Sequence, residues 1–204
     1  MRDRGSSRGK GDIDMTESGG AGTSVPAEGD RARALAAAKA WARIEGEGED
    51  ALLGQMLDAA FALAEVFTGQ VLIAREVVAV RPASPWWGTI GVTPVTSVGR
   101  VRGLPADGAA FDLPVESYGI DIDANGDGWV RVTHPGAGGR VEVTLTAGIA
   151  ADWASLPPPI AQGIVHLAAD RFMARDRDLP PPAAVGALWR PFRRMRLTGT
   201  RAAP

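Results

Sequence analysis

The apolar residues change their spacing twice along the chain, and this change constrains the fold more than any other feature. From Leu52 to Phe67 they recur every three or four residues, which is typical of a helix with one buried stripe. From Val71 to Thr146 β-branched stretches alternate with polar residues between Pro, Gly and Asp turns, and from Ile160 to Phe172 the helical spacing returns. The sequence therefore predicts an α+β fold: helices at both ends of the chain, a small inserted antiparallel β module, and an extended C-terminal arm.

Local signals give the expected boundaries. Asp30 can cap an Ala-rich helix that runs to about Ile44, and Gly69 stands where a left-handed residue would end the next helix. Three prolines at 157–159 suit the first turn of a helix, where a missing N–H is no loss, and three more at 180–182 end it. We expect a disordered N-terminal tail (1–29), N-terminal helices (30–69) and the β insertion (70–148). A C-terminal helix (149–179) and a docking arm (180–204) should follow.

The β insertion contains five strand-like stretches joined by short connections. These are 71–80, 89–104, 115–123, 129–133 and 140–146. Consecutive strands with short connections pair antiparallel, so we expect one antiparallel sheet. The clearest alternation is that of Val141, Val143 and Leu145 with polar neighbours, which indicates one buried face.

Composition excludes several classes of function. The chain of 204 residues is 45% hydrophobic and 23% charged, which is a globular composition, and it contains no cysteine, so thiolate nucleophiles and cysteine-based metal sites are excluded. We find no apolar run near the roughly 20 residues that a membrane helix needs, and we expect no membrane contact. Eight arginines and two aspartates lie from Arg171 to Pro204, so this end carries +6 and the remainder −8. Such a distribution favours an acidic partner for the C-terminal end.

The segment from Asp121 to Gly128 resembles the start of an EF-hand calcium loop. However, the twelfth position is Val132 instead of a bidentate glutamate, and the flanks alternate like strands. Asn125 and Gly126 are typical of a tight hairpin turn, so we predict a β-hairpin and no metal site.

Catalytic signals are weak. His166 lies four residues from both Gln162 and Asp170, which indicates an exposed Asp–His pair, and His134 precedes a proline in a turn. We find no nucleophile elbow, phosphate loop or dinucleotide fingerprint. The sequence therefore predicts neither an enzyme nor a cofactor.

Two segments carry residues that are common in interfaces. Trp86 and Trp87 follow a proline-rich turn and form either an aromatic anchor at a subunit interface or a lid over the β module. From Val185 to Met195 apolar residues alternate with arginines, and Pro191 disfavours a continuous helix and the helical conformation of Arg190. The segment could be a helix folded back on its own domain, but we favour an arm that docks on a partner.

The order of the parts resembles a known family. Two helices end in Glu65–Leu72, a β insert carries Pro94–Val98 and Tyr118–Asp121, and Leu156–Ile160 opens a helix that precedes the closing Leu188–Arg193. Over about residues 31–197 this order resembles the head–tail connector (adaptor) proteins of long-tailed phages and of gene transfer agents. The long N-terminal tail is not part of that pattern.

The resemblance implies a structural protein of a virion or gene transfer agent particle, assembled in the bacterial cytoplasm. Subunits of that family form a ring, typically of twelve, beneath the portal of a filled head, and they support the next connector (stopper) ring or the tail. DNA passes through the bore, so any DNA contact would be non-specific. By resemblance, the C-terminal segment engages the portal through Trp189, Arg190, Phe192, Arg193, Arg194 and Arg196. The alternative is a sequence-independent nucleic-acid-binding module that uses the same arginines.

Overall fold

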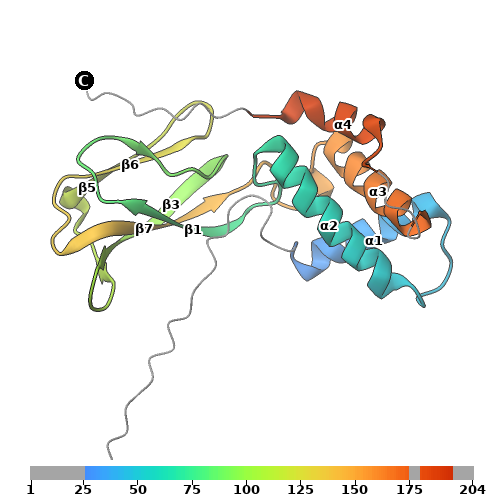
Figure 1. Ribbon diagram of the computed structural model, residues 1–204, viewed down its shortest axis with the longest axis horizontal. Helices are drawn as coiled ribbons and strands as arrows, with labels where there is room; N and C mark the ends of the chain where they lie inside the picture. Colours follow the sequence, from blue (N-terminus) through green and yellow to red (C-terminus); the bar gives the residue numbers. More distant parts are fainter. Residues whose placement is uncertain (1–25, 175–179, 195–204) are drawn as a thin grey trace, which may run out of the picture.

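The computed structural model describes residues 26–174 and 180–194, and it has helices on one side and strands on the other (Figure 1). The α+β prediction is confirmed. The helices of the described chain are α1 (Glu28–Ala42), α2 (Asp50–Thr68), α3 (Pro158–Met173) and α4 (Ala183–Trp189). The short 3-10 helices are η1 (Val115–Ser117), η2 (Trp153–Ser155) and η3 (Arg190–Phe192).

The observed helix ends agree with two of the boundaries predicted from the sequence and contradict a third. Gly69 adopts the left-handed conformation (φ 69°) and donates its N–H to the Glu65 carbonyl, as predicted. α3 begins on the proline cluster, also as predicted. The cap assigned to Asp30 is wrong: α1 begins at Glu28, and Asp30 lies inside its first turn, where the carboxylate accepts the Trp153 N–H at 2.9 Å. Asp30 therefore joins α1 to η2 instead of starting a helix.

The helical part has one core, formed by the inward faces of α1, α2, α3 and α4 together with η2. Its buried members include Leu53, Leu57, Phe61, Leu72, Trp153, Ile160, Ile164, Phe172, Val185 and Trp189. The spacing of these residues on α2 and α3 is that of the predicted stripes. Burial of these apolar side chains is the main source of stability in this half.

The strands form two sheets, so the expectation of one sheet is wrong. The first has the order β1-β7-β3-β4 and the second the order β2-β6-β5, with antiparallel pairs throughout. The first strand of the module pairs with the last, and this contact returns the chain to the helical part (Figure 1). The strands are β1 (Arg75–Pro82), β2 (Gly88–Thr89), β3 (Val95–Pro105), β4 (Phe111–Asp112), β5 (Tyr118–Ile122), β6 (Gly128–Val132) and β7 (Gly138–Ala147).

The β module has its own apolar core. It includes Val77, Ala79, Ile90, Val95, Val101, Val130, Val132, Val141, Val143 and Leu145, so the predicted buried face of the 140–146 stretch is confirmed. β5 and β6 form the predicted hairpin at 121–128. Asp123 Oδ1 accepts the N–H groups of Asn125 (2.8 Å) and Asp127 (3.0 Å), and Gly126 adopts a positive φ of 79°. A glycine suits this position because it has no side chain to oppose a left-handed backbone.

α2 is long and apolar enough to meet the criterion for a membrane helix, although no such apolar run was expected from the sequence. It has 19 residues and a mean hydropathy of 1.4, which by length and composition alone would let it cross a membrane. In the protein 44% of this stretch is buried, and its inward stripe packs in the helical core. Its two interior charges are paired, since Asp58 bonds Arg31 and the fully buried Glu65 bonds Arg75.

Candidate interaction surfaces

The described part of the C-terminal arm, residues 180–194, is packed on its own domain, which corrects the view of an extended segment there. α4 buries Val185 and Trp189, whose exposed fractions are 1% and 2%. α4 ends at Trp189, so the helix is not continuous through Pro191, as predicted, but Arg190 keeps a helical conformation (φ −53°, ψ −40°), so that part of the prediction is wrong. Pro191 instead lies in the first turn of η3, where its missing N–H costs nothing.

Trp189 is held by α3 and α2. Its ring lies over Gly163, and a Cβ at that glycine would come within 2.3 Å of the indole Nε1. The indole N–H donates to the Ile160 carbonyl at 3.3 Å, and the ring centroid lies 5.8 Å from that of Phe67. A tryptophan with these contacts fastens the arm to its own subunit, and it is not an exposed anchor for a partner.

The end of the arm is tied to the junction between the two halves. Gln70 Nε2 donates to the Phe192 carbonyl at 2.6 Å, and the Arg194 N–H donates to the Thr68 carbonyl at 2.8 Å. The Arg194 guanidinium also donates to the carbonyl of Asn125 in the β5–β6 hairpin. The arm therefore contacts both the end of α2 and the β module.

Exposed cations remain on this fastened segment. Arg190 and Arg193 are exposed, and the Arg193 guanidinium lies 5.8 Å from the ring centroid of Phe67. Arg194 and Phe192 are partly buried, and Arg196 lies outside the described residues. Of the described residues that the resemblance assigns to portal docking, Arg190 and Arg193 are the two that are exposed to solvent.

The two tryptophans differ in exposure. Trp86 is 59% exposed, whereas the half-buried Trp87 lies against Gly119 and beneath the Arg131 guanidinium, which is 4.8 Å from its ring centroid. The sequence reading missed Arg131, because the contact joins strands far apart in the chain. The two tryptophans and Arg131 have the composition of an interface anchor, and their role as interface aromatics stays a prediction.

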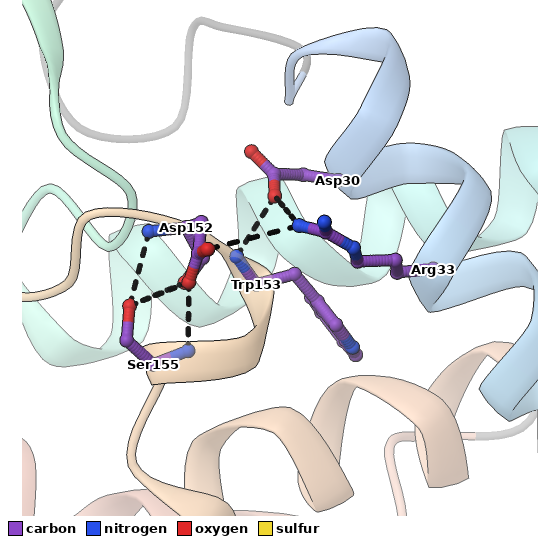
Figure 2. A network of polar contacts seen from close by, with 5 residues as sticks. All are labelled: Asp30, Arg33, Asp152, Trp153 and Ser155. Atoms are coloured by element: carbon purple, nitrogen blue, oxygen red, sulfur yellow. Dashed lines mark hydrogen bonds and ion pairs between the residues drawn. The ribbon is translucent and has the colours of Figure 1, made fainter.

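A polar network fixes η2 against α1 (Figure 2). Arg33 lies between two carboxylates, 3.7 Å from Asp30 and 3.7 Å from Asp152. Asp152 accepts from the hydroxyl (2.7 Å) and the N–H (2.9 Å) of Ser155, and these hydrogen bonds with the Arg33 charge lower its pKa below the ordinary value. The network fixes the backbone of η2 against α1, and Trp153 of η2 is buried in the helical core.

A groove between α1 and α3 lies beside this network, and the sequence analysis missed it. It has a volume of about 500 Å³ and is lined by Ala37, Ala40, Trp41, Trp153, Ala161, Gln162, Val165 and His166. The expected role of His166 in an exposed Asp–His pair is wrong, since its ring stacks on Trp41 with centroids 4.0 Å apart. The Nε2 atom of His166 is buried and has no hydrogen-bond partner among the described residues.

Comparisons with known proteins show which solved structures this chain is similar to. No protein-family model matches the sequence, and none of the curated proteins matches it. Solved structures do match. A chain from the neck of an empty gene transfer agent (GTA) particle, computed with C6 symmetry, is 28% identical with a TM-score of 0.67, and the match covers 89% of this chain and 95% of that one.

Two further structures give the same result. A chain from the virion of a native GTA particle is 29% identical with a TM-score of 0.63, covering 90% of this chain and 96% of that one. A chain from the neck of a native GTA particle, computed with C12 symmetry, is 29% identical with a TM-score of 0.62, covering 83% and 94%. These matches confirm the resemblance expected from the sequence: the chain is similar in sequence and in fold to chains of the neck and the virion of gene transfer agent particles.

Proposed function

We propose that this protein is a structural head–tail adaptor subunit that forms a ring beneath the portal of a gene transfer agent or related phage particle. It links the DNA-filled head to further connector and tail proteins. The observation that carries the proposal is the likeness to GTA neck chains along nearly the whole of both chains. A ring of twelve is compatible with the C6 and C12 symmetries of those necks.

Portal docking in this proposal uses the outer side of the arm. Arg190 and Arg193 are exposed, while Trp189 and the bond from Gln70 to the Phe192 carbonyl hold the backbone that carries them. A segment that is already ordered loses less conformational entropy on binding than a free tail. In a ring, a modest contact is also repeated by every subunit, so avidity strengthens the attachment.

The docking role is tested with Arg190→Glu/Arg193→Glu in the full chain. Both side chains are exposed, so we expect an unchanged melting temperature but at least about a tenfold loss of incorporation into purified particles, since repeated contacts amplify a small loss per subunit. The matched control is Arg140→Glu, an exposed arginine on β7 that should incorporate normally. Normal incorporation of the double variant would show that this surface does not dock.

Nucleic-acid binding is the second candidate, because the same two arginines are exposed. Portal docking and DNA binding are distinguished by measuring the affinity of the isolated protein for duplex DNA at increasing salt concentration. A DNA binder loses affinity steeply, by about 0.9 units of log K per phosphate contact for each unit of log salt. A particle component that docks on protein should show weak DNA binding that Arg190→Glu/Arg193→Glu does not change.

A further inference from the structure

α2 presents an exposed face of five uncharged residues, Ala51, Gln55, Ala59, Leu63 and Val66. Ala62 is half-buried among them, and Asp58, whose side chain is 23% exposed and paired with Arg31, borders this face. Leu63 is 38% exposed and Val66 is 64% exposed. A helix on a protein surface normally carries charged residues on its outer side. The outer face of α2 therefore has the composition of a surface that is covered in the functional state.

The groove between α1 and α3 is the second uncharged surface of the helical part. Alanines from both helices form much of its lining, which permits close approach of a further helix. Trp41, which borders it, is 55% exposed, and no Asp, Glu, Lys or Arg of the described chain lines it. Both surfaces are thus apolar, and each includes a single glutamine, Gln55 on α2 and Gln162 on α3.

The two surfaces lie on different sides of the helical part. At about 100° per residue, Ala161 and Val165 lie between about 60° and 160° around α3 from the core residues Ile160, Ile164 and Leu167. The groove therefore lies beside the core stripe of α3, where α1 packs, while the exposed face of α2 points away from the same core. One copy cannot bring its own α2 face into its own groove.

We propose that the exposed face of α2 in one copy occupies the α1–α3 groove of the next copy around the ring. Contact between two different surfaces of identical chains is heterologous, and such a contact closes into a ring when the rotation between copies allows it. The related neck chains come from assemblies with C6 and C12 symmetry, which are built from repeated contacts of this kind. This inference rests on the proposed ring function and assigns the surfaces that would form it.

Two glutamines allow a polar contact inside this interface. The Nε2 of His166 is already covered within one copy, whereas Gln162 in the same groove is exposed. Gln55 is the residue of the α2 face with a hydrogen-bonding side chain, and its amide offers both a donor and an acceptor. A pairing of Gln55 with Gln162 would fix the register between the copies.

Cysteine cross-linking tests the contact, because the chain has no cysteine of its own. Ala59→Cys and Ala40→Cys place one thiol on each surface, and a short bis-maleimide reagent is applied to purified particles containing the double variant. We expect a ladder of covalent multimers from the double variant and at least tenfold less from either single variant. The control pair is Ala59→Cys with Ala187→Cys, which replaces the groove thiol with one on the exposed side of α4.

The outcomes separate this inference from the proposed function. Particles that contain the protein without a ladder, or with an equal ladder from the control pair, overturn the assigned contact while the neck role stands. Absence of the wild-type protein from particles overturns both. An independent variant, Ala59→Glu, should fold with an unchanged far-ultraviolet spectrum and lose ring assembly at least tenfold, whereas Ala187→Glu should assemble normally. Normal assembly of Ala59→Glu would also overturn the contact.

Discussion

Removal of the buried carboxylate of Glu65 should strongly destabilise the protein. The side chain is fully buried at the junction of α2 and β1, where its oxygens accept from both terminal nitrogens of Arg75 (2.7 and 2.9 Å) and from the Leu72 N–H (2.9 Å). Glu65→Ala leaves these donors without the carboxylate, and the Arg75 Nε is already buried without a partner. The variant therefore removes a buried ion pair that joins α2 to β1.

The magnitude follows from the burial of both partners. Breaking a buried ion pair by removal of one partner costs about 3–5 kcal/mol. The Arg75 side chain is 20% exposed, so water reaches part of the guanidinium, and we expect about 3 kcal/mol for Glu65→Ala. Glu65→Gln keeps an acceptor for the Leu72 N–H but loses the charge, so we expect a smaller loss of about 1.5 kcal/mol.

Urea unfolding with linear extrapolation measures these differences. The control is Glu76→Ala, which removes an exposed carboxylate from β1 and should change the free energy of unfolding by less than about 0.5 kcal/mol. A loss below about 1 kcal/mol for Glu65→Ala, or an equal loss for Glu76→Ala, would refute the reasoning from burial.

Three further predictions follow from the arm and the hairpin. Trp189→Ala should cost about 3–5 kcal/mol in urea unfolding because it empties a packed site, whereas an exposed anchor would cost almost nothing. Gly163→Ala should expel the indole, seen as a red shift of tryptophan emission; unshifted emission would contradict the 2.3 Å approach. Desolvation raises the pKa of Asp123, but the N–H groups of Asp127 and Asn125, the Trp129 indole and the Arg194 charge outweigh it and lower the pKa. The carboxylate therefore stabilises the fold above the ordinary value of 3.8, and this contribution disappears as pH falls through the lowered pKa. The free-energy difference between wild type and Asp123→Asn should shrink in the same range, and a difference that stays constant would show that Asp123 is not responsible.

Periodicity was sufficient to predict the long helices, because α2 and α3 each bury one stripe in a common core. Turn chemistry was sufficient for the hairpin, since the Asp123 and Gly126 conformations are local. The sheet order was beyond such reasoning. Pairing of Val77 with Leu145 depends on contacts between residues far apart in the chain, and alternation within a strand does not specify its partner.

The candidate surfaces were harder to predict than the fold. The spacing of Val185 and Trp189 is the same for a helix packed on its own domain and for one packed on a partner, so the pattern alone favoured the wrong alternative. Gly163 was a usable signal, because a glycine within a helix often makes room for a large neighbour. The uncharged residues of α2 were visible in the sequence, but the sequence did not show whether they were buried. The structure shows that the helical part of the protein leaves this face exposed.

The two hydrogen bonds of Arg194 have a mechanical consequence. Its backbone holds the last turn of α2 and its guanidinium holds the tip of the β5–β6 hairpin. A load applied through the arm would be divided between two regions that are far apart in the chain. A force on the C-terminal end would therefore be transmitted to both α2 and the hairpin, and it would displace the hairpin together with the end of α2.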